Sequence, residues 1–492
     1  MIGKRSTAEP MRVSLVNAPY FPRFSRAQRS PGVIKSNVLY YPYWLAHAAS
    51  LLRENGFAVQ LLDAVAEGLE RAAAVQRTVD FAPALVLVET STPSIDADVA
   101  FARAVKEATP ATRVFLVGTH VSALPEETLR DTGLDGALVG EYDLTALVLA
   151  QALAGGASLD AVDGLALVDD QEVRRTTPRA PVENLDDLPW IAPVYREFLP
   201  LAAYNFSLAN HPMVMLISGR GCPNNCFFCL YPQVMHGRRY RARSPEHLIG
   251  EVEWIAKNMP AVREIVFEDD TFTADEQRAV RFAELKMQRG ITLPFFANLR
   301  VNTQAETINA LVRAGLRSCA VGFEAADEQT LAAMRKGITL DRAQQFMVDA
   351  RRAGLLVHGC FMVGFPGETT ASMERTLAYA IKLDPDSAQF YPVFPYPGTE
   401  AFAWAEQSDF LRTREWRQWL TPAGGHAAVI DQPGLTAAVQ WAFCERAYRR
   451  FHFRPKYIFK KLVQAIRQPA EGWRSVRGLL AYLRYLLRAS GR

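Results

Sequence analysis

The chain has 492 residues, 49% of them hydrophobic and 22% charged, and a formal net charge of +3 at pH 7. These values are typical of a globular protein of roughly three domains and exclude a disordered or collagen-like chain. No run approaches the ~18 consecutive apolar residues of a membrane-spanning helix, and residues 1–16 lack the apolar core of a secretory signal.

Residues 1–155 alternate short apolar runs with amphipathic stretches. The pattern predicts strands at residues 12–17, 59–63, 84–88, 113–117 and 136–139, with helices at residues 42–55, 69–80, 96–108 and 144–154. Continuous apolar strands joined by helices are typical of a doubly wound, Rossmann-like parallel sheet. Ligands of such sheets bind beyond the carboxyl ends of the strands.

Residues 156–203 change character, because a hairpin at residues 164–173, turning at Asp169-Asp170, precedes an acidic, proline-bearing linker at residues 183–193. A second series of strands and helices follows. Its strands are predicted at residues 213–218, 264–268, 294–299, 318–323, 356–363 and 387–393. The six strands indicate a partial (β/α)6 barrel of the TIM type over residues 204–405, with its chemistry at the carboxyl ends of the strands. Residues 406–492 form a helical C-terminal region.

Three of the six cysteines, Cys222, Cys226 and Cys229, lie within eight residues directly after the first strand of the predicted barrel. Clustering of this kind, without a secretory signal, indicates a metal centre rather than disulfides. A zinc site usually needs four ligands in two pairs, and only His236 lies nearby as a fourth, so an iron–sulfur cluster is favoured over zinc and over coincidence. Three thiolates can hold three irons of a [4Fe–4S] cluster and leave the fourth open to an amine and a carboxylate.

With Phe228 before the third cysteine, the motif Cys-x3-Cys-x2-Cys resembles the signature of the radical S-adenosylmethionine (SAM) superfamily. The resemblance implies that the open iron binds the methionyl part of SAM. One electron from the cluster then cleaves SAM to methionine and a 5′-deoxyadenosyl radical, which abstracts hydrogen from an unactivated C–H bond. It also implies a one-electron reductant, such as flavodoxin or ferredoxin, as a partner.

The resemblance further implies a SAM site at the ends of the next strands, although each of its residues has an alternative reading as an ordinary strand-end or turn residue. Acidic side chains after the second strand would accept from the SAM ammonium group. Polar residues after the third and fourth strands would contact the carboxylate or ribose, and glycines after the fifth would let the backbone approach the adenine. The residues are Glu268, Asp269, Asp270, Asn298, Arg300, Glu324, Gly364, Pro366 and Gly367.

The remaining cysteines have plainer explanations. His358 and Cys360 share one side of the fifth strand, where packing is a better account than a functional pair. Cys319 and Cys444 are expected to be buried thiols.

A parallel sheet in front of such a barrel resembles the cobalamin-binding subclass, and the resemblance covers roughly residues 11 to 400. It implies that a planar corrin lies against small and hydroxyl residues at the strand ends. These residues are Asn17, Thr90, Ser91, Gly118, Thr119, His120, Val121, Gly140 and Glu141. None of the eight histidines stands in an Asp-x-His-x-x-Gly motif, so either cobalamin binds without a protein histidine or the domain has lost it. The aromatic stretch 25–44 fits a ligand wall and core packing equally well.

The net charge is unevenly distributed, since residues 451–492 hold ten Lys or Arg and one acid, a local charge of +9 against −6 for the rest. The tail predicts a basic amphipathic helix. Its apolar residues are Trp473, Val476, Leu479, Leu480, Leu483, Leu486 and Leu487, and its basic residues are Arg474, Arg477, Arg484 and Arg488. The helix fits an anionic membrane surface or packing on the acidic body, and no nucleic-acid-binding module is recognisable.

Residues 219–247 are most similar to the hopanoid and lipid-tailoring branch of the cobalamin-type enzymes, which implies a hydrophobic or lipid-like substrate. The sequence therefore predicts an enzyme with [4Fe–4S], SAM and cobalamin as cofactors that methylates an unactivated carbon. Two alternatives stay open, namely radical rearrangement, ring contraction or oxidative cyclisation without methyl transfer, and a non-catalytic corrinoid or cluster sensor. The expected location is the cytoplasm or the inner membrane face, with no nucleic-acid partner.

Overall fold

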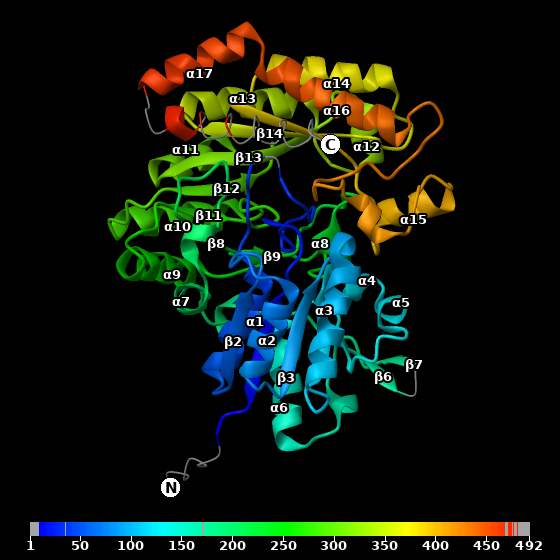
Figure 1. Ribbon diagram of the computed structural model, residues 1–492. Helices are drawn as coiled ribbons and strands as arrows, with labels where there is room; N and C mark the ends of the chain where they lie inside the picture. Colours follow the sequence, from blue (N-terminus) through cyan, green and yellow to red (C-terminus); the bar gives the residue numbers. More distant parts are fainter. Residues whose placement is uncertain are drawn as a thin grey trace. The chain divides into compact units, whose positions relative to one another are not determined.

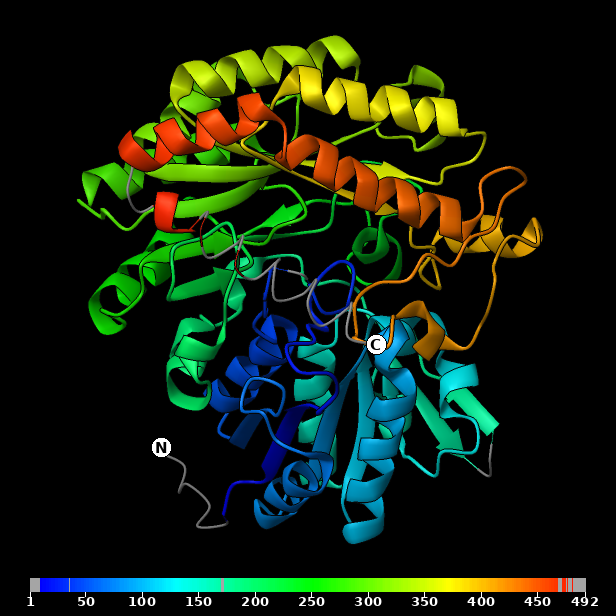
Figure 2. The ribbon, with the colours of Figure 1, turned by 45° about the horizontal axis from the view of Figure 1, so that its top comes forward.

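The structure is a computed structural model that describes residues 9–34, 36–169, 172–467, 471–474, 476 and 480. Its contacts divide the chain into two compact units (Figures 1 and 2). Unit 1 comprises Met1–Pro22, Pro42–Val182 and Asp187–Pro200, and unit 2 comprises Arg23–Tyr41, Glu183–Asp186 and Leu201–Arg492.

The loop Arg23–Tyr41 belongs to unit 2, although the sequence placed it in the N-terminal domain. Aromatic contacts explain the difference. The hydroxyl of Tyr41 donates to the carbonyl of Met213 over 2.8 Å, and its ring stacks on Tyr204 with centroids 3.8 Å apart. Such buried aromatic pairs outweigh the loop's proximity in sequence to the first strand.

Unit 1 is a seven-stranded sheet in the order β2-β1-β3-β4-β5-β6-β7. Its strands are β1 Arg12–Asn17, β2 Ala58–Asp63, β3 Leu85–Thr90, β4 Arg113–Gly118, β5 Gly136–Leu138, β6 Leu165–Asp169 and β7 Glu172–Arg175. Its helices are α1 Tyr43–Glu54, α2 Arg71–Asp80, α3 Ile95–Ala108, α4 Thr119–Ala123, α5 Pro125–Leu129, α6 Asp143–Gly155 and α7 Ala192–Phe198. Helix α1 packs with α6, and α2 with α3.

The first five strands of unit 1 are parallel, as the continuous apolar runs predicted. The predicted hairpin is part of the same sheet, because β6 pairs antiparallel with β5 and with β7. The sheet is therefore mixed. Asp170, at the predicted hairpin turn, lies outside the described residues.

Unit 2 is built on a six-stranded, all-parallel sheet in the order β15-β14-β13-β12-β11-β8, with β8 and β15 at its edges (Figure 1). This open sheet confirms the partial barrel. Its strands are β8 Met213–Leu216, β11 Glu264–Phe267, β12 Phe295–Leu299, β13 Leu316–Glu324, β14 Leu356–Val363 and β15 Ser387–Pro392. A short antiparallel pair is formed by β9 Gly219–Arg220 and β10 Arg241–Ala242.

Five of the seven helices between these strands start at a residue whose side chain caps the helix. The seven helices are α8 Leu230–Val234, α9 Pro245–Asn258, α10 Glu276–Gln288, α11 Ala305–Arg313, α12 Glu328–Ala333, α13 Leu340–Ala353 and α14 Thr370–Leu383. The side chains of Ser244, Asp275, Asp327, Thr339 and Thr369 accept the capping bonds of α9, α10, α12, α13 and α14. The caps fix where each loop between strand and helix ends, and these loops carry the candidate site.

The C-terminal region contains α15 Glu400–Gln407, α16 Ala437–His452 and α17 Pro455–Arg467. Helix α16 packs on β15. The start of the tail also contacts the barrel, since Arg317 pairs with Glu264 and Glu471 and Arg474 donates to the carbonyl of Leu208 over 2.8 Å. Most of the predicted tail helix lies outside the described residues.

Candidate functional site

The three clustered cysteines lie in one loop between β9 and α8, at the carboxyl end of the barrel sheet. Cys222 and Cys226 are 8% and 6% exposed, and Cys229 is half-buried. The loop turns at Gly221, whose φ of +78° and whose distance of 2.2 Å between a would-be Cβ and the carbonyl oxygen of Arg239 exclude a side chain. The three thiols of the motif therefore lie on one loop that begins with a tight turn at Gly221.

Backbone contacts hold this loop in place. The amide of Phe227 donates to the carbonyl of Met334 over 3.1 Å, and the side-chain amide of Gln233 donates to the carbonyls of Phe227 and Cys229 over 3.1 and 2.9 Å. The side-chain amide of Asn224 donates to the sulfur of Cys222 over 3.2 Å. An amide donor to sulfur stabilises a thiolate, and such bonds tune iron–sulfur clusters.

The donor set fits a cluster better than a single ion. Burial, followed by the charges of Asp270 and Cys226, raises the pKa of Cys229, so a strongly bound cation is needed to keep the thiolate form. Within the part of the chain that the structure describes, no three His, Cys, Asp or Glu side chains meet closely enough to hold one metal ion. A [4Fe–4S] cluster does not need that convergence, because each thiolate binds a different iron.

The acidic motif follows β11, and its members have different surroundings. Asp269 accepts from the backbone amide of Ser218 over 2.6 Å and from its hydroxyl, so it fixes the residue that leads into the cysteine loop. Glu268 pairs with Arg29 and lies 3.4 Å from the side-chain amide of Asn298. Burial raises the pKa of both Glu268 and Asp269. No local pattern in the sequence pointed to Arg29, which precedes Glu268 by 239 residues.

A second charged group lies beside the cysteine loop at the end of β13. The ammonium group of Lys336 donates to Glu324 over 2.7 Å and lies 5.9 Å from the ring centroid of Phe228. Arg300 donates to the carbonyl of Lys336 over 2.6 Å. Glu324 itself adopts φ of +61°, a strained conformation of the kind found at functional sites.

Among the described residues, two buried polar atoms of this group have no hydrogen-bond partner, namely Oε2 of Glu324 and Nε of Arg300. Buried polar atoms are almost always paired, so this pair of atoms fits a polar ligand such as SAM. Sequence reasoning missed Lys336. Its position in the loop after α12, rather than at the end of a strand, concealed it.

The loop after β14 is closed by a carboxylate. Glu368 accepts from the backbone amides of Gly364 and Phe365 over 2.7 and 3.1 Å, and Gln432 donates to the carbonyl of Gly364 over 2.7 Å. Phe365 contacts the ring of Phe228. The glycine turn expected to approach adenine therefore lies beside the cysteine loop, with Glu368 holding its shape.

The remaining cysteines and His358 lie as expected. Cys319 and Cys444 are buried, at 0% and 4% exposure. His358 and Cys360 are half-buried, and Nδ1 of His358 lies 2.8 Å from the hydroxyl of Ser387. Burial lowers the pKa of His358 to about 4 and raises the pKa of Cys360 to about 12, so both are uncharged at neutral pH.

In unit 1, the predicted cobalamin residues gather at the ends of neighbouring strands. The hydroxyl of Ser122 donates to the carbonyl of Gly118 over 2.7 Å and accepts from the amide of Gly140 over 3.0 Å. The hydroxyl of Thr90 donates to the carbonyl of Val117 over 2.8 Å, and Nδ1 of His120 lies 3.1 Å from the hydroxyl of Thr92. Glycine and short hydroxyl side chains leave the backbone accessible to a flat ligand, which fits a corrin.

The other predicted cobalamin residues have three kinds of surroundings. Asn17 donates to Asp63 over 2.8 Å, across the register of β1 and β2. Ser91 and Thr119 are buried at the strand ends, together with Glu141. Val121 belongs to the hydrophobic core of unit 1, so it supports the strand-end loop from inside.

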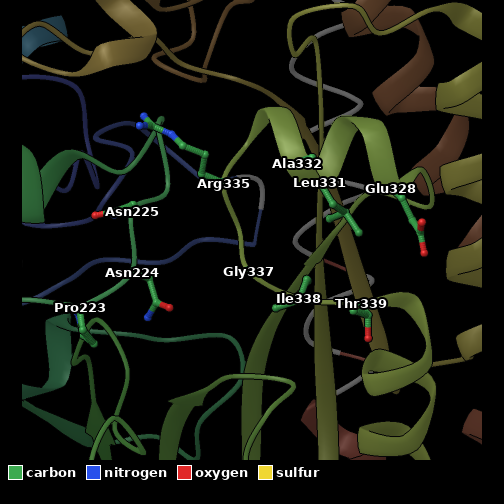
Figure 3. A pocket seen from close by; sticks show the side chains of 10 residues that line it. All are labelled: Pro223, Asn224, Asn225, Glu328, Leu331, Ala332, Arg335, Gly337, Ile338 and Thr339. Carbon is green, nitrogen blue, oxygen red and sulfur yellow. The ribbon is translucent and has the colours of Figure 1, made fainter.

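A cavity of about 730 Å³ adjoins the cysteine loop (Figure 3). Pro223, Asn224 and Asn225 form one wall, and the end of α12 with the following residues up to Thr339 forms the other. Asn224 lines this cavity and also donates to Cys222. The cavity therefore borders the cysteine loop.

Comparison with known families matches both units. The radical SAM superfamily model matches residues 216–380, and the B12 binding domain model matches residues 29–150. The first match contains all three clustered cysteines. The second begins at Arg29, so it includes part of the loop that packs in unit 2.

Individual proteins are similar over most of the chain. An uncharacterised methyltransferase of Pyrococcus horikoshii is 32% identical over 444 residues, covering 89% of this chain and 93% of the relative. The anaerobic magnesium-protoporphyrin IX monomethyl ester cyclase of Rubrivivax gelatinosus is 26% identical, covering 73% of this chain and 65% of the relative. The solved structure of the radical SAM methyltransferase TsrM from Kitasatospora setae, with cobalamin and a [4Fe–4S] cluster bound, shares the fold at a TM-score of 0.70 and 18% identity, covering 91% and 90% of the two chains.

Proposed function

The chain belongs to the cobalamin-dependent radical SAM enzymes, and we propose that it transfers a methyl group to an unactivated carbon. One observation carries the proposal. The cysteine loop, the acidic end of β11 and the Glu324–Lys336 pair lie around Phe228 and Cys229 in one unit of a chain that is similar over 89% of its length to an uncharacterised methyltransferase. As a radical SAM enzyme it needs a substrate and a one-electron reductant.

The cofactors are a [4Fe–4S] cluster, SAM and cobalamin. When bound, the cluster supplies the electron that cleaves one SAM to methionine and a 5′-deoxyadenosyl radical, and cobalamin supplies the methyl group drawn from a second SAM. Each product methylation thus takes two electrons from the reductant, one to cleave SAM and one to return cobalamin to the form that accepts a methyl group from SAM, and yields one 5′-deoxyadenosine and one S-adenosylhomocysteine.

Different residues of the chain bind the cluster and the methionyl part of SAM. Cys222, Cys226 and Cys229 hold the cluster. Glu268 and Asp270 bind the SAM ammonium group, while Arg300 and Lys336 place positive charge where its carboxylate lies. Charge-assisted bonds of this kind fix the methionyl group in one orientation.

The rest of the SAM and cobalamin sites is supplied by loops. Asn298 and Glu324 contact the polar part of SAM, and the turn Gly364, Pro366 and Gly367 approaches its adenine. The strand ends of unit 1 would hold cobalamin, which would supply the methyl group. The corrin contacts are Asn17, Thr90, Ser91, Gly118, Thr119, His120, Gly140 and Glu141.

Two measurements test the proposal. Anaerobic reconstitution should give an iron–sulfur absorbance that Cys226→Ala abolishes and that is retained when Cys444, a buried thiol of α16, is replaced by Ala. With a reductant and a substrate, the products of SAM should include S-adenosylhomocysteine and 5′-deoxyadenosine in equal amounts. Retention of the chromophore by Cys226→Ala would refute the cluster assignment.

A second reaction has its own support, because the cyclase of Rubrivivax gelatinosus covers 73% of this chain. Radical rearrangement, ring contraction or oxidative cyclisation would consume SAM without methyl transfer. The same product assay separates the two, since 5′-deoxyadenosine without stoichiometric S-adenosylhomocysteine identifies the second reaction. A non-catalytic sensor is not proposed, because the family is one of enzymes.

We further propose that the substrate is hydrophobic or lipid-like and that the C-terminal region docks on an anionic membrane surface. Ile458, Phe459, Leu462 and Ile466 of α17 are 44%, 69%, 59% and 81% exposed, and Lys456 on the same helix is also exposed. An apolar helix face flanked by lysines suits insertion into an anionic lipid interface. No helix among the described residues is long and apolar enough to cross a membrane.

A flotation assay tests the docking. Vesicles of phosphatidylglycerol should bind the wild-type protein more strongly than vesicles of phosphatidylcholine, and Phe459→Ser with Ile466→Ser should lose that binding. Val439→Ser is the matched control, because Val439 is an exposed apolar residue on α16. Equal flotation of the double variant and the wild type would contradict the proposal.

A further inference from the structure

We infer that Arg29 is a positioning residue for SAM, which holds the carboxylate of Glu268 in place and in its charged form so that Glu268 can bind the SAM ammonium group. The inference rests on the proposed function, in which the end of β11 binds the methionyl part of SAM. Arg29 lies in the first tenth of the chain, yet it completes a site formed by the barrel.

The contacts of Arg29 converge on the acidic end of β11. Its Nη1 pairs with Oε1 of Glu268, and its Nη2 donates to the carbonyls of Glu268 and Asp269 over 3.0 and 2.6 Å. Nη2 also lies 3.5 Å from Oδ1 of Asp270. One guanidinium thus binds two carboxylates and two carbonyls, which fixes the backbone and side chain of this strand end together.

The loop that carries Arg29 is anchored on both sides of it. The hydroxyl of Tyr231, two residues after Cys229, donates to the carbonyl of Ala27 over 2.6 Å. Nε2 of His426 lies 3.0 and 3.1 Å from the carbonyls of Ser30 and Pro31. The backbone on one side of Arg29 is therefore held by α8, the helix that follows the cysteine loop, and the backbone on the other side by His426 of the C-terminal region, which together direct Arg29 toward β11.

Electrostatics give this contact a chemical role. Glu268 is 4% exposed, and burial raises its pKa, while the charge of Arg29 is the strongest influence that lowers it. Within the part of the chain that the structure describes, Glu268 also faces Asp269 on its own strand end, Asn298 on β12, Tyr40 in the same loop as Arg29 and Cys360 on β14. None of these four carries a positive charge, so Arg29 supplies the cation that favours the carboxylate form.

A protonated Glu268 would not attract the ammonium group of SAM. Removing Arg29 should therefore weaken SAM binding in a manner that depends on pH, because a rise in pH restores the carboxylate. A purely structural role of Arg29 would weaken binding equally at every pH. A role as a rival cation, occupying the carboxylate in place of SAM, would instead strengthen binding when Arg29 is removed.

The test uses the reconstituted holoenzyme with reductant and follows SAM cleavage between pH 6.5 and 8.5, which yields KM for SAM and the maximal rate of cleavage per enzyme, kcat. Arg29→Gln should raise KM about tenfold over wild type at pH 6.5, and the ratio should fall toward about 2 at pH 8.5, with kcat changed less than KM. Arg29→Lys keeps the positive charge but not the forked contacts, so its KM should depend less on pH than that of Arg29→Gln. Arg23→Gln is the matched control, since Arg23 lies in the same loop but, within the described residues, donates to the carbonyls of Asn37 and Ala203 and not to the end of β11.

Glu268→Gln keeps the inference testable if Arg29→Gln folds poorly. It should raise KM as Arg29→Gln does at pH 6.5 but show no recovery at pH 8.5. An unchanged or lowered KM in Arg29→Gln, or an increase that is the same at both pH values, would overturn the inference. If the wild-type enzyme failed to cleave SAM, the proposed function itself would be refuted. That outcome is distinct from a failure of the inference on Arg29, in which the wild type cleaves SAM and only the variants depart from expectation.

Discussion

The ammonium nitrogen of Lys336 lies 2.7 Å from a carboxylate oxygen of Glu324, and the two side chains are 12% and 4% exposed. Burial opposes the charge of Lys336, but Glu324 and Cys226 outweigh it, so its pKa is raised. A buried pair of this kind adds little stability compared with apolar residues of similar size. It lies beside Phe228, where we propose that SAM binds.

Lys336→Met should abolish most SAM cleavage and lower the free energy of unfolding by about 3 kcal/mol, because Glu324 is left buried and unpaired. The double variant Lys336→Met with Glu324→Gln should regain most of the stability without regaining activity. Urea unfolding and 5′-deoxyadenosine formation measure the two effects. Lys257→Met, which breaks the exposed pair with Glu253, should change stability by less than about 0.5 kcal/mol.

Glu368 should make stability depend on pH. Burial raises its pKa to about 7 from 4.5, so the folded protein holds this proton more tightly than the unfolded chain does. The resulting stabilisation is fully present below about pH 4.5 and is lost as pH rises through 7, a change of about 3 kcal/mol.

Glu368→Gln cannot lose a proton and should therefore remove this dependence. The difference in unfolding free energy between wild type and variant, measured in urea at pH 5, 6, 7 and 8, should shift steadily in favour of the variant. Parallel curves for the two proteins over this range would contradict the role assigned to Glu368.

Gly118→Ala should destabilise unit 1 and reduce its retention of cobalamin. Gly118 has φ of +106° and ψ of −171°, a region open almost only to glycine, and a Cβ there would lie 2.5 Å from the carbonyl oxygen of Thr90. The expected loss is about 3 kcal/mol.

Gly56→Ala provides the control for this prediction. Gly56 also has a positive φ, of +85°, but a Cβ there would meet nothing within 4 Å, so only about 1 kcal/mol of backbone strain is expected. Thermal unfolding and the cobalamin absorbance that remains after gel filtration measure both variants. Equal effects of the two substitutions would show that the contact with Thr90 is unimportant.

The sequence predicted what depends on local pattern. Apolar runs located the parallel strands of both units, and the spacing of Cys222, Cys226 and Cys229 located the thiol loop, because each signal is contained in a few consecutive residues. The resemblance to the radical SAM superfamily implied Glu268 and Glu324 at the carboxyl ends of barrel strands, and the structure has them at the ends of β11 and β13.

Contacts between distant segments were not predictable. Arg29 meets Glu268 across 239 residues, and Lys336 follows a helix rather than a strand, so neither fits a local motif. The antiparallel joining of β6 to β5 also went unseen, since the hairpin pattern specifies pairing between β6 and β7 but not their neighbour. Asp269 and Glu268 are alike in type, yet only the structure reveals that Asp269 is engaged by Ser218.

The loop Arg23–Tyr41 has a consequence for how this enzyme can be divided or recombined. A chain that began at Leu201 would contain every barrel strand and all three clustered cysteines, yet it would lack Arg29 and also Tyr41, which donates to Met213 of β8. Modular shuffling of the barrel with another N-terminal domain would have to carry this loop along. This loop lies between two stretches of the first unit in the sequence but belongs to the second unit in the structure. We therefore expect the two units to be inherited together as one gene.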